Sequence, residues 1–290
     1  MMDKTLPSDA CRYFNEAMET LDRPQIEALQ LERLQATVRR CMNSPFYKER
    51  FEQAGLKPED IRSLDDLRRI PFTTKKDLRD TYPFGISCVP LRQCVRLHSS
   101  SGTTGNPTVI LHTQNDLDEW ANQVARNLWM VGLRPDDVFQ NSSGYGMFTG
   151  GLGFQYGAER LGMLTIPAAA GNSLRQIKFM TDFGTTALHA VPSYVTRLYE
   201  VMQSCGVDPR KDTKLRVLAI GAEPHSEEQR KRIEEMMGVK AYNSFGMSEM
   251  CGPGVGFECP EQNGLHFWED YYIVEIVDPE TLEPVPDGEV

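Results

Sequence analysis

The stretch SSSGTTGNPT, residues 99–108, gathers six hydroxyl side chains and two glycines in ten residues. No charged residue occurs between Arg96 and Asp116. Glycines let successive backbone N–H groups converge on an anion, and hydroxyl groups rotate to donate to its oxygens. No lysine lies in the loop and the chain has no G-x-G-x-x-G, which excludes two common phosphate motifs. A neutral phosphate-binding loop and a plain hairpin remain the alternatives.

A second glycine cluster, GYGMFTGGLGFQYG, covers residues 144–157 and alternates glycines with aromatic residues. Glycine lets a ligand approach the backbone closely, and aromatic rings can form the walls of a site. The pattern suits a flat aromatic or acyl ligand. The alternative is a helix packed tightly against a sheet.

Two apolar runs end in residues able to bind a nucleotide. LRVLAI, residues 215–220, is followed by Gly221, and AYNSFGMSEM, residues 241–250, contains Phe245 and Glu249. Ligands of open α/β sheets sit at the carboxyl ends of strands. A carboxylate beside bound phosphates is a natural Mg²⁺ ligand, and Phe245 could stack on a base. Taken singly, each segment also has a purely structural interpretation.

A possible zinc site lies just after the second of these runs. Cys251, Cys259 and His266 have the ligand types that Zn²⁺ prefers, with the spacing C-x7-C-x6-H. This is not a usual finger spacing, and a fourth ligand is missing. Two buried free cysteines and a surface histidine are the alternative. Two other histidines, His98 and His189, are either neighbours of a nucleotide or hydrogen-bonded strand and loop residues.

The elements that would position these residues follow from periodicity. Residues 9–82 are predicted to be mostly helical, and Leu31, Leu34, Val38 and Cys41 fall on one helical face. After residue 90 short β-rich runs alternate with helical stretches, which predicts a mostly parallel sheet flanked by helices. The expected strands are 109–112, 163–167, 186–191, 215–220, 239–242 and 271–277. The expected helices are 116–130, 173–183, 193–204 and 226–237.

Composition narrows the class of protein. The chain has 290 residues and a net charge of −10, which disfavours a broad surface for nucleic acid or anionic lipid. The first residues lack the apolar core of a signal peptide, and no apolar run is long enough to span a membrane. Seven cysteines without a C-x-x-C favour a reducing cytoplasm. The oligomeric state stays open, with a homodimer as one alternative.

Together, SSSGTTGNPT, AIGAEP and YNSFGMSE resemble, in order, the phosphate loop, adenine-strand loop and YGxSE-type motif of adenylate-forming acyl/aryl-CoA ligases. QLERLQATVRR, NSPFYKERFEQAGLKPEDIRSLDDLRRIPFTTKKDLRDTYPFG and GYGMFTGGLG resemble the phenylacetate–CoA ligase branch. The resemblance covers nearly the whole chain. It implies the α/β large N-terminal domain of such an enzyme, with a helical region at 1–90 and a nucleotide- and acyl-binding part at 91–290. The family's small C-terminal domain, with its catalytic lysine, has no counterpart before Val290.

The resemblance implies an AMP-forming ligase that activates phenylacetate or a similar aromatic acid with Mg-ATP and transfers the acyl group to coenzyme A. Adenylyl transfer to another acceptor, as in coenzyme F390 synthetases, and nucleotide binding without catalysis are the alternatives. A chain of this extent is then expected to bind nucleotide but to adenylate poorly.

Site residues also follow from the resemblance, position by position. Thr104, Ser248 and Glu249 are the expected catalytic residues, with Glu249 binding Mg²⁺. The phosphates are expected on Ser99, Ser101, Gly102, Thr103, Thr104 and Gly105. The rest of the nucleotide is expected on Gly221, Ala222, Glu223, Pro224, Phe245, Gly246, Met247 and Ser248. Phe245 stands where the family favours tyrosine, which keeps stacking but loses a hydroxyl contact. The acyl pocket is expected on Tyr145, Phe148, Gly150, Ala222 and Met247.

Overall fold

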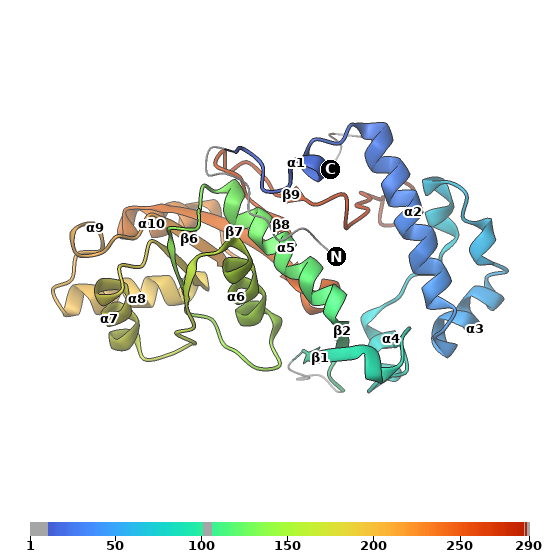
Figure 1. Ribbon diagram of the computed structural model, residues 1–290, viewed down its shortest axis with the longest axis horizontal. Coiled ribbons are helices and arrows are strands. Elements are labelled where there is room, and N and C mark those ends of the chain that lie inside the picture. Colours follow the sequence, from blue (N-terminus) through green and yellow to red (C-terminus); the bar gives the residue numbers. More distant parts are fainter. Residues whose placement is uncertain (1–10, 101–105, 287, 289–290) are drawn as a thin grey trace.

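A computed structural model describes residues 11–100, 106–286 and 288 (Figure 1). Its first part is helical. Asp22 accepts a hydrogen bond from the backbone of Gln25, and this capping box starts the longest helix of the region. The elements of this part are α1 (Glu16–Glu19), α2 (Arg23–Cys41), α3 (Pro45–Gln53), η1 (Pro58–Asp60), η2 (Leu64–Arg69), α4 (Lys75–Asp80) and η3 (Leu91–Gln93).

The helical region has a small core of its own. Val38, Phe51, Leu56 and Ile61 are buried together, with Leu31, Leu34 and Cys41 packed beside them. The helical face predicted for α2 is therefore confirmed. In Figure 1, α2 and α3 lie at the opposite end of the molecule from α7 and α9.

A two-stranded antiparallel hairpin follows, formed by β1 (Cys94–Ser99) and β2 (Val109–Thr113). Ser99 pairs with Val109, and residues 100 and 106–108 are the described part of the connection between the two strands. The Ser100 N–H donates to the Thr108 carbonyl oxygen at 3.0 Å, and the Thr108 N–H donates to Ser100 Oγ at 3.0 Å. These two bonds close the base of the loop.

A seven-stranded sheet forms the rest of the framework, in the order β4-β3-β5-β6-β7-β8-β9. The strands from β4 to β7 are parallel, and β8 and β9 add antiparallel pairs. Their bounds are β3 (Val138–Asn141), β4 (Leu164–Ile166), β5 (Ala187–Ala190), β6 (Val217–Gly221), β7 (Lys240–Met247), β8 (Gly252–Phe257) and β9 (His266–Phe267). The mostly parallel sheet flanked by helices is thus confirmed.

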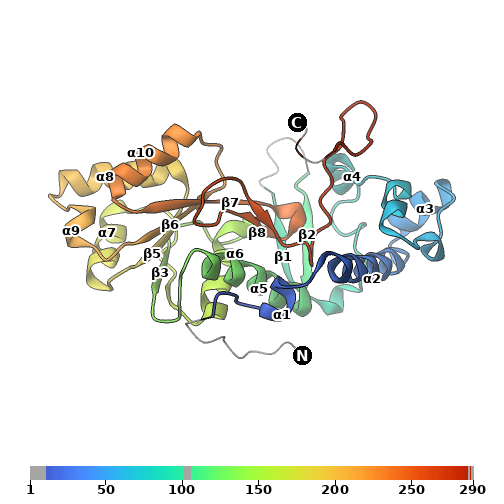
Figure 2. The ribbon, with the colours of Figure 1, turned by 90° about the horizontal axis from the view of Figure 1, so that it is seen from above.

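Helices cover both faces of this sheet: α5 (Gln114–Met130), α6 (Thr149–Leu161), α7 (Ser173–Asp182), α8 (Pro192–Ser204), α9 (Pro209–Asp212) and α10 (Glu227–Met237), followed later by η4 (Ser248–Met250). Figure 2 shows α8 and α10 on one side of the sheet and α5 and α6 on the other. The side chains of β6 point alternately to the two faces of the sheet. Val217 and Ala219 belong to the core beneath α5 and α6, and Leu218 and Ile220 belong to the core beneath α8 and α10.

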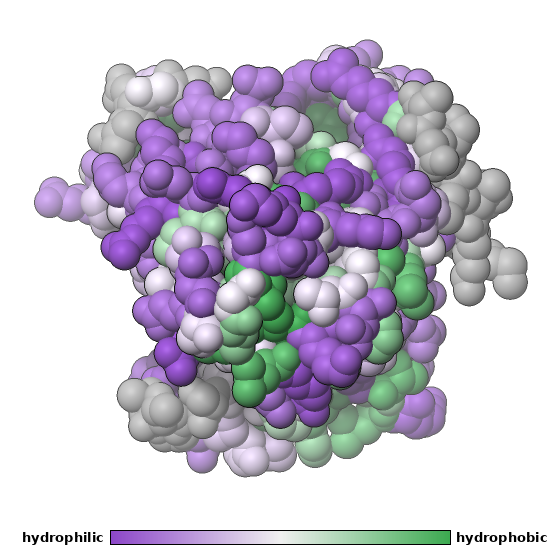
Figure 3. Space-filling model, turned by 90° about the vertical axis from the view of Figure 1, so that its left-hand side faces the viewer, coloured by the Kyte–Doolittle hydropathy of each residue, from purple (hydrophilic) through white to green (hydrophobic). Residues whose placement is uncertain are grey.

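The end of the molecule formed by α7 to α9 has a mostly hydrophilic surface with a smaller hydrophobic group on it (Figure 3). Leu174 and Phe183, at the two ends of α7, are among the exposed apolar side chains of the protein. Within the described ranges, no helix is both long and apolar enough to cross a lipid bilayer.

Helix α6 resolves the interpretation of the second glycine cluster. A Cβ on Gly153 would lie 2.5 Å from a ring carbon of Trp120, and one on Gly157 would lie 2.3 Å from Cγ1 of Val124. Helices α5 and α6 therefore pack at a distance that only glycine permits. The alternative, a helix packed tightly against a sheet, holds only for Gly153, whose Cβ would also lie 2.5 Å from Pro253 of β8; Gly157 packs against helix α5 instead. The start of the same segment forms part of a cavity.

One predicted strand is wrong. Residues 271–277 do not join the sheet, and Val277 makes only an isolated bridge to Pro284. Tyr271 and Tyr272 turn instead toward α5, where the Tyr272 hydroxyl donates to Gln123 Oε1 at 2.8 Å and the Tyr271 hydroxyl donates to Glu119. The aromatic side chains of this segment bury themselves against a helix rather than extending a strand.

Candidate active site

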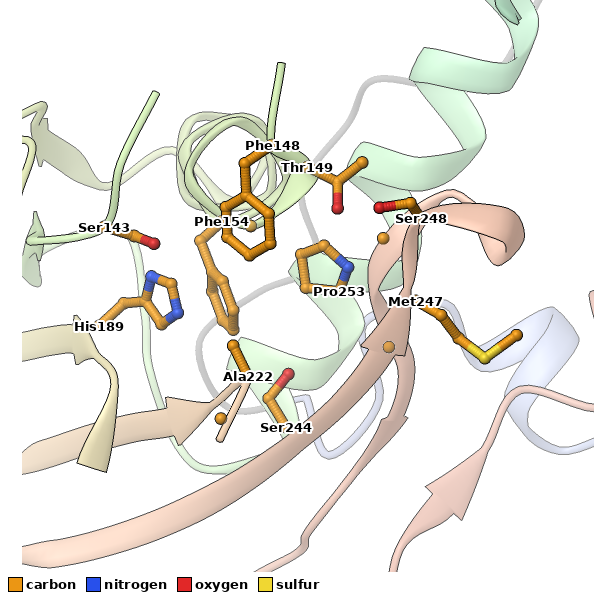
Figure 4. A pocket seen from close by; sticks show the side chains of 14 residues that line it. Ser143, Phe148, Thr149, Phe154, His189, Ala222, Ser244, Met247, Ser248 and Pro253 are labelled. Atoms are coloured by element: carbon orange, nitrogen blue, oxygen red, sulfur yellow. The ribbon is translucent and has the colours of Figure 1, made fainter. Parts of the chain in front are cut away.

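A cavity of about 200 Å³ opens at the carboxyl ends of β5 and β6 and beside the end of β7 (Figure 4). Its walls come from α6, the strand ends and the start of β8. The lining residues are Ser143, Phe148, Thr149, Gly150, Phe154, His189, Gly221, Ala222, Ser244, Gly246, Met247, Ser248, Gly252 and Pro253. Four of the five residues predicted for an acyl pocket, Phe148, Gly150, Ala222 and Met247, are among them.

The fifth predicted residue, Tyr145, is not among the described residues that line this cavity. Its hydroxyl accepts a hydrogen bond from Asn141 Nδ2 at 3.0 Å and donates one to Gln155 Oε1 at 2.6 Å. Burial raises the pKa of Tyr145 to about 12, so the phenol stays protonated. Tyr145 therefore holds the wall of the cavity rather than forming its surface.

The end of β6 shapes the floor of the cavity. A Cβ on Gly221 would lie 2.4 Å from the Ser244 carbonyl oxygen of the neighbouring strand, so this position requires glycine. Ala222 follows with φ of 65°, a left-handed conformation that turns the chain sharply. Glu223 does not line the cavity, and it accepts hydrogen bonds from the Ser193 N–H at 3.0 Å and the Ser193 hydroxyl at 2.8 Å.

The end of β7 bears an exposed aromatic ring. Phe245 is 41% exposed, and its ring meets that of Phe267 edge-on at 6.1 Å. Neither Phe245 nor Glu223 lines the 200 Å³ cavity. The cavity therefore combines predicted acyl residues with five of the residues predicted to bind the nucleotide, Gly221, Ala222, Gly246, Met247 and Ser248, while Glu223 and Phe245 lie outside it.

The side chain of Glu249, in η4, is contacted by residues from two other parts of the chain. The hydroxyl of Thr108, which is fully buried at the end of the glycine loop, donates to Glu249 Oε1 at 3.4 Å. Lys75 Nζ, from the first turn of α4, lies 3.6 Å from the same oxygen. Thr108, the last residue of the stretch that contains the predicted phosphate loop, thus contacts the predicted metal carboxylate, whereas the predicted phosphate ligands at residues 101–105 lie outside the described residues.

Lys75 is the neighbour of Glu249 that sequence reasoning missed. It stands in TTKKD, where Thr74 and Asp77 form the capping box of a short helix. Nothing in that local pattern distinguishes Lys75 from Lys76, which pairs instead with Asp80 on the surface. Only the tertiary approach of α4 to η4 sets the two lysines apart.

A second, larger cavity of about 890 Å³ begins at Glu249 and runs between the helical region and the β1–β2 hairpin. Arg40, Tyr47 and Phe84 line it from the helical side, and Gln114 and Asp116 from the start of α5. The carboxylate of Glu249 is therefore reached from an open groove, which leaves room for a charged ligand beside it.

Two histidines are buried beneath the hairpin. His98 Nδ1 donates a hydrogen bond to the Met147 carbonyl oxygen at 3.0 Å. In the part of the chain that the structure describes, neither ring nitrogen of His112 has a hydrogen-bond partner. The His112 ring stacks on Trp120 at 5.7 Å. Burial lowers the pKa of His98 and lowers that of His112 to about 4. Both rings are therefore neutral at pH 7, and neither lines the two cavities described above.

The zinc site is not formed. Across residues 11–100 and 106–286, no three His, Cys, Asp or Glu side chains gather closely enough to hold a metal ion. Cys251 precedes β8 and Cys259 follows it, so roughly 20 Å of extended strand separates them. His266 is exposed on β9, and both cysteines are free. The alternative is correct in giving two free cysteines and a surface histidine, but the cysteines are half-buried rather than buried.

Comparison with known proteins agrees with this geometry. The family described as AMP-binding enzyme matches residues 43–290 of the chain. The chain belongs to the AMP-binding enzyme family. Two curated relatives of this AMP-binding enzyme are the phenylacetate–coenzyme A ligases of Pseudomonas putida, 45% identical over 284 residues, and of Thermus thermophilus, 46% identical over 279 residues. The matches cover 97% and 96% of this chain but 64% and 62% of those relatives, so the chain spans less than two thirds of their length.

Solved structures give the same result for the fold. An open conformation of 2-hydroxyisobutyryl-CoA ligase, in complex with 2-HIB-AMP and CoA, has a TM-score of 0.93 and 30% identity. That match covers 100% of this AMP-binding enzyme and 65% of the ligase. A benzoate CoA ligase from Burkholderia xenovorans LB400, with a TM-score of 0.55 and 19% identity, shares the fold alone.

Proposed function

We propose that this chain is the nucleotide- and acyl-binding part of an AMP-forming aryl-acid–CoA ligase, with phenylacetate or a similar aromatic acid as its substrate. The observation that carries the proposal is the partly open cavity lined by Phe148 and Phe154, beside the cluster of Thr108, Glu249 and Lys75. The names of the curated relatives support coenzyme A as the acyl acceptor. They favour thioester formation over adenylyl transfer to another acceptor and over binding without catalysis.

The proposed reaction has two halves. The acid's carboxylate attacks the α-phosphate of ATP, which forms acyl-AMP and releases pyrophosphate. The thiolate of coenzyme A then attacks the acyl carbon and releases AMP. The protein's task in the first half is to bring two anions together and to stabilise the charge that develops between them. Neutral donors around the hairpin and the ammonium of Lys75 are suited to that task.

The residues carried over from the family resemblance keep their proposed roles. Ser99 and residues 101–105 bind the β- and γ-phosphates, with Thr104 and Ser248 close to the reacting phosphate. Residues 221–224 and Phe245 bind the adenine, and Gly246 the ribose. The division into a helical region at 1–90 and a ligand-binding part at 91–290 also remains a proposal.

Glu249 is the proposed Mg²⁺ ligand. The donor set fits, because the Glu249 carboxylate and the Thr108 hydroxyl offer the oxygen ligands that Mg²⁺ prefers and would hold the ion beside the phosphates. When bound, the ion neutralises phosphate charge as pyrophosphate leaves. A reducing compartment such as the cytoplasm fits the seven free cysteines, and a homodimer remains an alternative to a monomer.

Calorimetric titration tests the proposal directly on this chain. The probes are Mg-ATP and the non-hydrolysable phenylacetyl sulfamoyl adenylate. We expect both to bind, and Glu249→Gln to abolish the effect of Mg²⁺ on ATP affinity. Glu261→Gln, an exposed glutamate beyond β8, is the matched control and should behave as the unaltered chain. Absence of binding by either probe, or an unchanged Mg²⁺ effect in Glu249→Gln, would refute the proposal.

A further inference from the structure

The amide of Asn141, at the end of β3, has an orientation fixed by two backbone groups. Its Nδ2 lies 2.6 Å from the Gly151 carbonyl oxygen, which can only accept a hydrogen bond. Its Oδ1 lies 3.3 Å from the Ser143 backbone N–H, which can only donate. The two contacts agree, so Oδ1 and Nδ2 cannot be exchanged.

This orientation determines the tautomer of His189 on the neighbouring strand. His189 Nδ1 lies 2.9 Å from Asn141 Oδ1, an oxygen without a proton, so Nδ1 must carry the hydrogen. Burial lowers the pKa of His189 to about 3, so the ring is neutral at pH 7. Nε2 is then a lone-pair acceptor, and it has no hydrogen-bond partner within the described ranges.

His189 lines the cavity that contains Phe148 and Gly150, which are expected in the acyl pocket alone. Gly221, Gly246 and Ser248, which are expected on the nucleotide, line the same cavity, whereas Glu223 and Phe245 do not. The ring of His189 stacks on Phe154 with 3.8 Å between the ring centroids, so polar contacts can be made only at the edge of the ring, where its nitrogen atoms lie. Figure 4 shows Ser143 and His189 on the same side of the cavity, with Phe154 between them and Pro253.

The Ser143 hydroxyl adds a second polar group there. Ser143 is 7% exposed and lines the same cavity, and its Oγ bonds to no other described residue. Besides the hydroxyls of Thr149, Ser244 and Ser248 elsewhere in the lining, the cavity thus has a polar corner made of an obligate acceptor and a hydroxyl. A buried acceptor favours a ligand that brings a donor and penalises one that leaves it unpaired.

We propose that His189 Nε2, with Ser143 Oγ beside it, selects aromatic acids that carry an O–H or N–H donor on the ring. This inference rests on the proposed function and specifies its substrate class. Hydroxyphenyl acids and acids with a ring N–H are the expected ligands. The adenine amino group is the other donor that a bound adenylate offers, and the experiment distinguishes the two sources.

The test compares sulfamoyl adenylates of phenylacetic acid and of its 3- and 4-hydroxy derivatives, titrated into this chain by calorimetry. We expect the better hydroxy derivative to bind about tenfold more tightly than the phenylacetyl compound. In His189→Phe, which keeps the stacking on Phe154 but removes the acceptor, this ratio should fall to about one. His225→Phe, a histidine outside the cavity, is the matched control and should keep the ratio.

The ratio separates this inference from the proposed function. If the phenylacetyl compound binds but the hydroxy derivatives gain nothing, or if His189→Phe weakens all three equally, His189 only packs and the inference fails while the ligase proposal stands. A further compound, the phenylacetyl analogue with a 6-oxo purine, has oxygen in place of the adenine amino group. If this change weakens binding to the unaltered chain but not to His189→Phe, the acceptor serves adenine and the inference also fails. If none of the compounds binds, the proposed function itself fails.

Discussion

At the scale of single residues, the cluster around Glu249 shows what a sequence can and cannot indicate. Glu249 and Thr108 belong to recognisable segments, and their meeting at 3.4 Å follows from where those segments end. Lys75 comes from a helix far away in the sequence, and only its place in space brings it to 3.6 Å from the carboxylate. His189 is similar, because its role depends on an amide oriented by α6 and not on its own surroundings in the sequence.

Lys75→Met should weaken Mg-ATP binding about tenfold, because it removes a cation next to the expected phosphates. Calorimetry with Mg-ATP measures the effect. Lys76→Met is the matched control, since Lys76 is highly exposed, pairs with Asp80 and should leave the affinity unchanged. Equal affinities in the two variants would contradict a role for Lys75 in nucleotide binding.

Buried neutral histidines also predict how stability depends on pH. Burial lowers the pKa values of His112 and His189 from 6.5 to about 4 and about 3 in the folded chain. Between pH 7 and pH 5 the unfolded chain therefore takes up protons that the folded chain does not, so stability falls as the pH falls. Each histidine should contribute a loss of roughly 2 kcal/mol in the free energy of unfolding over this interval.

Urea denaturation at pH 7 and pH 5 checks this expectation. His112→Gln, which cannot take up a proton, should show a smaller decrease between the two pH values than the unaltered chain. A free energy of unfolding that stays constant from pH 7 to pH 5 would show that these rings are protonated in the folded state.

At the scale of elements, strands made of apolar residues could be predicted, whereas strands that contain buried polar residues, glycines or a proline could not. Val217–Gly221 has a continuous apolar run and was found, whereas β3 contains Gln140 and Asn141, both fully buried within hydrogen-bond networks. Strand β8 contains three glycines and a proline, which ordinarily argue against a strand. Helix α6 contains glycines that lower helix propensity but permit its contact with α5.

The contact between α5 and α6 gives a prediction at this scale. Gly157→Ala should improve helix propensity, yet its Cβ would lie 2.3 Å from Val124 Cγ1 and force the helices apart. We expect a net loss of about 1 to 3 kcal/mol in the free energy of unfolding, measured by urea denaturation. Gly144→Ala, where a Cβ meets nothing within 4 Å, is the control. A stabilised Gly157→Ala would contradict the packing described here.

At the scale of the whole molecule, one buried ion pair joins distant parts of the chain. Arg126 of α5 binds Asp270 at 2.9 Å and Glu19 of α1 at 3.0 Å, and its guanidinium lies 3.9 Å from the Trp268 ring centre. The side chains of Arg126 and Asp270 are 2% and 4% exposed. The sequence offers no sign of this link, because its members lie more than a hundred residues apart.

Arg126→Ala should therefore lower the free energy of unfolding by about 3 to 5 kcal/mol, because Asp270 would be left buried without a partner. Arg23→Ala is a matched control, since Arg23 pairs with the adjacent Glu269 on the surface and such pairs contribute little. Urea denaturation of both variants makes the comparison. Similar small losses in the two would show that the Arg126 pair is not a structural link.

The central claim is that the cavity beside α6 holds the acyl group while Glu249 faces the phosphates. A crystal structure of this chain with phenylacetyl sulfamoyl adenylate and Mg²⁺ tests it most directly. The account predicts the phenyl ring between Phe148, Phe154 and Pro253, with the sulfamoyl group on the side of Ser248 and Glu249. A phenyl ring bound in the groove lined by Arg40 and Tyr47, with the cavity empty, would contradict it.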